Sequence, residues 1–234
     1  MKKNNKFTFI ELLIVFIIVL ILVALLLPAL RMVKQKSVRL ACLSNLRQCF
    51  SANLVYAKDN TMEMPKSGAD NMKFDAYRNG SMNNNDLRKL IGSYIKNDYS
   101  IWACPNVDQP QRMDHQRNTR YELRCNYYYL PGKSRSSISI KVTRNVSRQL
   151  SSDPIMSDQL YNWNFKGFRA THMKGGKYFK PYGNNPSLRM YKEGDPHGAN
   201  AVHADGRGAW FDFDKISFVG VDGSKGRHYV PLVE

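Results

Sequence analysis

The sequence predicts a chain that combines helix and strand, with one long N-terminal helix ahead of a domain of short strands. Residues 12–30 are apolar at every position except Pro28, and a run of this length is typical of a helix. Residues 38–58 repeat apolar positions every three or four residues, which is the period of an amphipathic helix. Beyond residue 59 that period is lost, and short apolar stretches between Gly, Pro and Asn indicate strands.

The composition limits the class of protein. The chain has 234 residues, 43% of them hydrophobic, which suits one globular domain with an appendage and excludes a wholly disordered chain. Four cysteines are too few for a disulfide-rich scaffold. The formal net charge of +16 would by itself suggest a nucleic-acid binder.

The apolar run is long enough to cross a membrane. Extended by residues 7–10, it spans about 30 Å or more as a helix, which matches the hydrocarbon core of a bilayer. A buried soluble helix is the weaker alternative, because charge-free runs of this length are rare in soluble cores. A cleaved secretory signal is also weaker, because the run is too long and no small-x-small site follows it. Basic residues on both sides leave the orientation open.

Glu11 is out of place because it lies just inside this apolar segment. A carboxylate at membrane depth is costly, so it needs a partner or a function unless it marks the interfacial edge of the helix.

Residues 6–15, KFTFIELLIV, resemble the processing site of type IV prepilins and type II secretion pseudopilins. In that family a prepilin peptidase removes a short basic leader before a Phe, and the new terminal amine is N-methylated. The resemblance implies cleavage between Lys6 and Phe7, N-methylation of Phe7, and Glu11 as the glutamate that the family keeps in its hydrophobic stretch. The family usually has Gly where this chain has Lys6, and Pro28 falls where it has a helix-kinking proline.

The resemblance implies the fold class α+β and a pilin-like architecture. A long N-terminal helix, first transmembrane and then amphipathic, would pack on a C-terminal domain with an antiparallel sheet. We expect a leader at 1–6, a transmembrane segment at 7–30, an amphipathic stalk helix at 31–58 and a soluble domain at 59–234. Pro28 removes one backbone hydrogen bond, so we expect a kink or local melting near Ala24.

The family also implies partners and a location. In a bundle of such helices, Glu11 of one subunit would neutralise the terminal amine of its neighbour, which sets the stagger between subunits. The expected partners are identical or related pilin subunits, the prepilin peptidase/methyltransferase and the inner membrane. The chain would be a single-pass inner-membrane protein with its C-terminal domain outside the cytoplasm.

One face of the second half of the helix is expected to pack into the core of the soluble domain. Cys42 and Cys49 both lie on it, about 10 Å apart, so they are too distant to form a disulfide with each other and are expected to be buried thiols. The full stripe consists of Cys42, Leu43, Leu46, Cys49, Phe50, Asn53, Leu54, Tyr56 and Ala57.

The domain that follows is expected to contain one short helix and several strands. The helix covers residues 85–95, with Asn85 or Asp86 as its cap. Residues 163–194 are rich in Gly, Asn and Lys and are expected to form a long irregular excursion. The expected strands are Ser100–Ala103, Arg124–Leu130, Ser137–Val142, Pro154–Ser157, Ala199–Ala204 and Gly208–Phe213.

Cys104 and Cys125 leave two alternatives open. Outside the cytoplasm a disulfide between them is allowed, and free buried thiols are about as compatible with the sequence. A zinc site ranks lower because the chain has no C-x-x-C pair.

The C-terminal motif DPHGANAVHADGR, residues 195–207, resembles the ending of a prepilin-like family in which nine residues separate a His from Asp-Gly. Asp195 occupies that His position here, and His197 follows two residues later, while Asn200, Asp205 and Gly206 align. Asp205 and Gly206 between apolar arms predict a hairpin turn. A metal or catalytic site of His197, His203 and Asp205 is the weaker alternative.

The remaining residues predict no enzyme and no cofactor, since P-loop, G-x-S-x-G and H-E-x-x-H motifs are absent. The function expected is a structural subunit of a type IV pilus or type II secretion pseudopilus. Three other classes stay open: a DNA-binding minor pilin, a non-assembling single-pass surface protein and, least favoured, an anchored enzyme. The basic charge fits either nucleic acid or anionic lipid.

Overall fold

The structure is a computed structural model of the chain and divides into two compact units, Met1–Val38 and Arg39–Glu234. The described residues are 8–66, 87–95, 101, 104–106, 127–132, 142–158, 160–163, 168–170, 172, 177–179, 191–194, 196–221 and 226–231.

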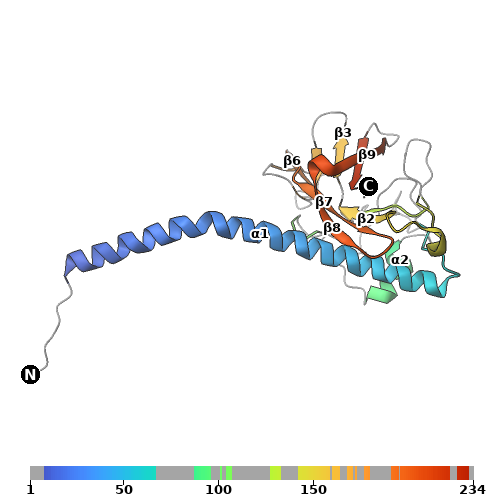
Figure 1. The fold of residues 1–234 in the computed structure, drawn as a ribbon, viewed down its shortest axis with the longest axis horizontal. Coiled ribbons are helices and arrows are strands. Elements are labelled where there is room, and N and C mark those ends of the chain that lie inside the picture. The colour runs from blue at the N-terminus through green and yellow to red at the C-terminus, as the bar shows by residue number, and fades with distance from the viewer. Residues whose placement is uncertain are drawn as a thin grey trace, which may run out of the picture. The chain divides into compact units, whose positions relative to one another are not determined.

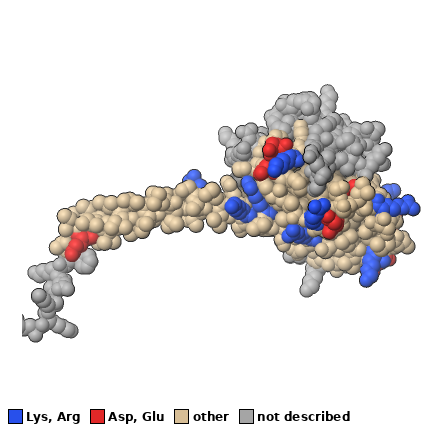
Figure 2. Space-filling model, viewed as in Figure 1, with Lys and Arg blue, Asp and Glu red and all other residues tan. Residues whose placement is uncertain are grey.

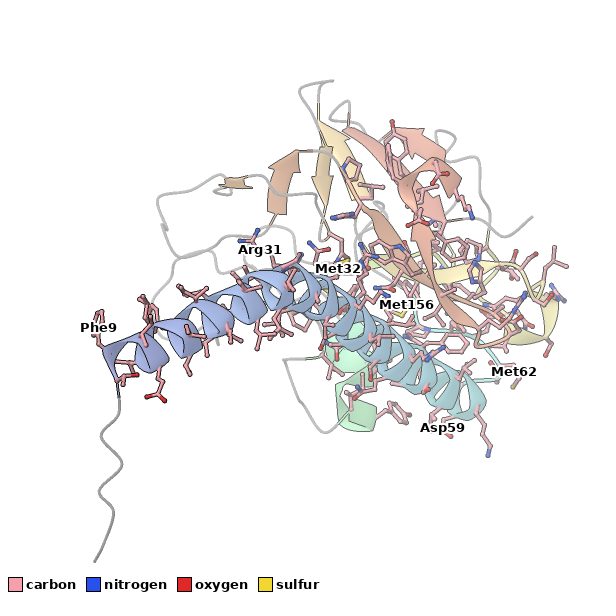
Figure 3. The ribbon with its side chains drawn as sticks, turned by 60° about the vertical axis from the view of Figure 1, so that its left-hand side comes forward. Phe9, Arg31, Met32, Asp59, Met62 and Met156 are labelled. Atoms are coloured by element: carbon pink, nitrogen blue, oxygen red, sulfur yellow. A yellow bond between two sulfur atoms is a disulfide. The ribbon has the colours of Figure 1, made fainter. Side chains whose placement is uncertain are left out.

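The first unit contains the start of helix α1, Phe9–Asp59. Its large apolar side chains from Phe9 to Leu30 are between 45% and 80% exposed and project from all sides of the helix (Figure 3). The helix continues through Ala24 and Pro28 without a break, so the local melting that the sequence allowed does not occur. Among the described residues, this is the one helix long and apolar enough to cross a membrane.

The second half of α1 lies in the second unit and is amphipathic, as predicted. Most of the expected stripe is buried, and Leu54 and Tyr56 at its border are half-buried. The helix was expected to end near residue 58, and it ends at Asp59. There the backbone N–H of Met62 donates to the carbonyl of Ala57, and Thr61 and Met62 adopt left-handed backbone angles that terminate the helix.

The amphipathic half of α1 packs on a four-stranded antiparallel sheet in the order β1-β2-β7-β8. In Figure 1, β7 and β8 lie beside the second half of α1. The central strands β2 and β7 are buried at every position because they are covered on both faces. The strands are β1 (Tyr127–Tyr129), β2 (Pro154–Asp158), β7 (Gly198–His203) and β8 (Gly208–Asp212).

Glycine at the start of β8 leaves room for two side chains of the helix. A Cβ added at Gly208 would lie 2.8 Å from both the Arg47 guanidinium and the Leu43 side chain. Arg47 also donates a 3.0 Å hydrogen bond to the Gly208 carbonyl. Figure 3 shows Met156 of β2 over the same helix, where its sulfur lies 3.9 Å from the amide nitrogen of Asn53.

A second antiparallel sheet has six strands in the order β5-β6-β4-β3-β10-β9. Buried Leu160 of β3 packs against the half-buried Phe213, Ile216 and Tyr229. The strands are β3 (Leu160–Trp163), β4 (Phe168–Ala170), β5 (Lys177–Phe179), β6 (Tyr191–Gly194), β9 (Ile216–Val221) and β10 (Gly226–Pro231).

The α+β layout of a long N-terminal helix and antiparallel strands is therefore present. The irregular excursion expected at 163–194 is wrong, because β4, β5 and β6 lie in it. The short helix is α2 (Leu87–Gly92), followed by a 3₁₀ turn at Ser93–Ile95, and its expected cap lies outside the described residues.

Three of the expected strands lie partly outside the described residues. Of Arg124–Leu130, the structure describes β1 and Leu130. Ile101 forms part of a 3₁₀ turn rather than the strand expected at Ser100–Ala103. Of Ser137–Val142, only Val142 is described, and it forms an isolated bridge with Pro131.

Candidate functional site

The N-terminus of α1 is closed by a capping box formed by Thr8 and Glu11. The backbone N–H and the hydroxyl of Thr8 each donate a 2.8 Å hydrogen bond to Oε2 of Glu11. The backbone N–H of Glu11 in turn donates to Oγ1 of Thr8 at 3.4 Å. This reciprocal arrangement satisfies amides that the first helical turn leaves free. Lys6 and Phe7, where cleavage is expected, lie outside the described residues.

Glu11 thus has a local structural role within its own chain. A carboxylate in the first turn also interacts favourably with the positive end of the helix dipole. Both Thr8 contacts fall on Oε2, so the local role occupies one of the two carboxylate oxygens.

A disulfide joins α1 to the segment after Ile101, between Cys42 and Cys104, whose Cα atoms are 5.0 Å apart. Both alternatives left open for Cys104, a bond to Cys125 and a free buried thiol, are therefore wrong in this structure, and so is the expected free thiol at Cys42. Burial of the α1 stripe brings Cys42 against Cys104, which local spacing does not reveal. Cys125 lies outside the described residues, and Cys49 is the buried free thiol expected.

A buried polar network lies beside the disulfide. Nε2 of His172 is 3.5 Å from Sγ of Cys104 and 3.2 Å from Oδ2 of Asp158. His172 is 4% exposed and Asp158 is fully buried. Buried charge of this kind requires hydrogen-bonding partners, and Oδ2 of Asp158 has them.

Asn200 of β7 supplies those partners and links the strand to the helix. Its backbone N–H and its side-chain Nδ2 donate to Oδ2 of Asp158 at 2.8 and 2.9 Å. The same Nδ2 lies 3.1 Å from the backbone carbonyl of Arg39 in α1. Asn200, which the sequence singled out only by its place in the C-terminal motif, thus connects β2, β7 and α1.

Arg39 and Trp210 border the same network. The guanidinium carbon of Arg39 lies 3.9 Å from the Trp210 ring centroid, and His172 contacts that ring edge-on at 5.2 Å. Burial lowers the pKa of Arg39, which is opposed by the carboxylate of Asp212. The stacked guanidinium of Arg39 therefore places a positive charge near the network of His172 and Asp158.

The predicted hairpin at Asp205 and Gly206 is confirmed. β7 and β8 pair in register around it, and Gly206 has a φ of +82°, which glycine adopts without strain. The backbone N–H of Arg207 donates to Oδ1 of Asp205, and its guanidinium pairs with Oδ2. The Asp205 carboxylate is therefore engaged in the turn.

His197, His203 and Asp205 do not form a group of potential metal ligands in the part of the chain that the structure describes. His203 is buried against Phe211, and the backbone of His197 bonds to His172 and Phe213. Among the described residues, the one group of potential metal ligands is Cys42, Cys104 and His172.

Sequence reasoning missed His172 and Asp158. Neither residue belongs to a sequence motif with a second ligand or catalytic residue at a characteristic spacing. No local signal could therefore have identified them. No model of a known protein family matches the chain, and neither a curated protein nor a solved structure matches it.

Proposed function

We propose that the chain is a membrane-anchored structural subunit that assembles into a pilus or pseudopilus through its N-terminal helix. The observation that carries the proposal is the two-part character of α1. Its first part exposes apolar side chains on every side, whereas its second part is amphipathic and buries one face against a sheet. A fully apolar helix surface needs a bilayer or other helices around it.

The distribution of charge supports the same proposal. Figure 2 shows an uncharged surface between the acidic group at the start of α1 and its first basic side chain. Arg31, Lys34 and Lys36 follow the apolar run and are exposed, which suits contact with anionic headgroups. The apolar segment of 7–30 would then span the inner membrane.

The disulfide supports a location outside the cytoplasm for the second unit. Disulfides persist in oxidising compartments and are rare in the cytosol. The bond between Cys42 and Cys104 closes a segment with a sequence separation of 62, which corresponds to about 4 kcal/mol in the chain-entropy model. It would hold the domain on the helix once the chain has crossed the membrane.

In the proposed assembly, the charge of Glu11 pairs with the terminal amine of a neighbouring subunit after cleavage before Phe7. The capping box offers a competing explanation, in which Glu11 serves only its own helix. The two explanations differ in one respect. Capping can use a neutral glutamine, whereas pairing with an amine requires the carboxylate charge.

The test therefore uses three variants of the full chain. Glu11→Gln keeps a capping box and removes the charge, Thr8→Ala removes the cap and keeps the charge, and Thr8→Ser is the matched control. Membrane fractionation measures insertion, and sedimentation of cross-linked assemblies measures polymerisation. We expect all three variants to insert and only Glu11→Gln to lose assembly. Normal assembly of Glu11→Gln would contradict the proposal.

A further inference from the structure

Three buried side chains from distant parts of the chain meet beside β2. They are Cys42 of α1, Cys104 and His172, and their ligand atoms all lie within 4.8 Å of one another. The two sulfurs form a disulfide in the structure. The chain is synthesised with thiols, however, so this pair passes through a dithiol form before it is oxidised.

We propose that in the dithiol form the chain binds one Zn²⁺ through Sγ of Cys42, Sγ of Cys104 and Nε2 of His172. In a tetrahedral zinc site, with zinc bonds of about 2.3 Å to sulfur and 2.0 Å to nitrogen, a sulfur and a nitrogen ligand are about 3.5 Å apart. The observed distance between Sγ of Cys104 and Nε2 of His172 is 3.5 Å. Two thiolates and one imidazole are a ligand set that favours zinc over calcium or magnesium.

Asp158 lies beside the histidine of this site but outside the group of three ligands. Its Oδ2 is 3.2 Å from Nε2 of His172. Its Oδ1 is buried and has no hydrogen-bond partner among the described residues. A buried unpaired carboxylate oxygen is costly, and a divalent cation nearby would stabilise it.

The disulfide and the zinc site exclude each other, because both use the same two sulfurs. Binding of Zn²⁺ converts the two thiols to thiolates and releases two protons. Later oxidation by a small-molecule or protein disulfide transfers two electrons to that oxidant, which leaves as two thiols after proton uptake. The bond between Cys42 and Cys104 then forms and Zn²⁺ is released. The zinc form would thus hold α1 on the domain before the disulfide closes.

The burial of the ligands determines how the site must be loaded. Cys42 and Cys104 are fully buried and His172 is 4% exposed, so the ion enters as the second unit folds. The experiment therefore refolds the full chain from urea in a mild detergent with a phosphine reductant and either Zn²⁺ or Co²⁺. The oxidised chain, identified by intact mass, is refolded in parallel.

We expect one Zn²⁺ per reduced chain, none per oxidised chain, and a thiolate-to-cobalt charge-transfer absorption in the Co²⁺ form. X-ray absorption of the zinc form should show two sulfur ligands at about 2.3 Å with nitrogen or oxygen completing the shell. Cys42→Ser, Cys104→Ser and His172→Ala should each weaken binding at least about tenfold. Cys49→Ser, which changes a buried cysteine outside the group, is the matched control and should bind normally.

Several results would overturn the proposal. One is a zinc shell without sulfur or with more than two sulfurs, which does not depend on any variant. Others are wild-type affinity in His172→Ala, loss of binding in Cys49→Ser, or a reduced chain that folds without retaining zinc. A reduced chain that fails to refold even with Zn²⁺, judged by circular dichroism, would overturn it as well.

Discussion

Replacing Asp158 by Ala should be among the most damaging single changes in the second unit. Its Oδ2 accepts two hydrogen bonds from Asn200 and contacts His172, all in a fully buried site. A hydrogen bond to a charged group contributes about 1.5–3 kcal/mol, so the two bonds together represent about 3–6 kcal/mol. Removing Asp158 also leaves the buried donors of Asn200 and the side chain of His172 without their acceptor. A loss of stability of this size is therefore expected.

Two further variants divide that loss into its causes. Asp158→Asn keeps an acceptor of the same shape but removes the charge, and should cost about half as much. Asp214→Ala is the matched control, because Asp214 is an exposed acidic residue in the 3₁₀ turn that follows β8. We expect that control to change stability little.

The assay is urea unfolding of the full oxidised chain in mild detergent, followed by tryptophan fluorescence and circular dichroism. Coincident transitions would show that one free energy of unfolding describes the second unit. A double-mutant cycle with Asn200→Ala should give a coupling energy of at least about 1 kcal/mol. A loss for Asp158→Ala no larger than that for Asp214→Ala would refute the reasoning.

Three further predictions concern the same sheet and use the same assay. Gly206→Ala should lower the free energy of unfolding by about 1–2 kcal/mol, because its φ of +82° is unfavourable for alanine. The added Cβ itself would make only an ordinary contact, 3.6 Å from Phe50. A cost no larger than that of a neutral surface substitution would contradict the prediction. Gly208→Val should cost about 1 kcal/mol, because its Cβ would lie 2.8 Å from the side chains of Arg47 and Leu43, so both must shift and the hydrogen bond of Arg47 to the Gly208 carbonyl is disturbed. An unchanged unfolding midpoint would count against this packing. Burial lowers the pKa of His203 from 6.5, partly opposed by its hydrogen bond to the Arg207 backbone and by Asp205. Below pH of about 6.5 the unfolded state therefore binds more protons than the folded state, so stability should fall as the pH drops until the folded pKa is passed. His203→Phe should flatten that slope, and an unchanged slope in this variant would show that another group is responsible.

The parts of the fold that follow from local pattern were predictable. The buried stripe of α1 and its end near residue 58 follow from a sustained helical period. The β7–β8 hairpin follows from Asp205 and Gly206, but its loop has three residues, Ala204–Gly206, because the backbone N–H of His203 already donates to the carbonyl of Arg207. Gly206 takes the positive φ that closes this loop.

The second sheet was largely missed for a physical reason. β4 and β5 have three residues each and β6 has four, which is too short for an alternating pattern to be read. The sheet to which they belong also depends on the non-local pairing of β10 with β3, which the sequence of neither strand reveals.

The group of Cys42, Cys104 and His172 was missed for a related reason. A helical pattern showed that Cys42 would be buried, but not which residue would face it. The partner, Cys104, lies 62 residues away, and His172 comes from a stretch expected to be irregular. Only the packing of α1 against the sheet brings these residues together.

The most direct test of a processed, membrane-anchored subunit is the N-terminal sequence and intact mass of the chain extracted from membranes of cells that express it. We predict a chain in the membrane fraction that begins at an N-methylated Phe7. Recovery of the chain with Met1 intact, or mainly in the soluble fraction, would contradict the proposal.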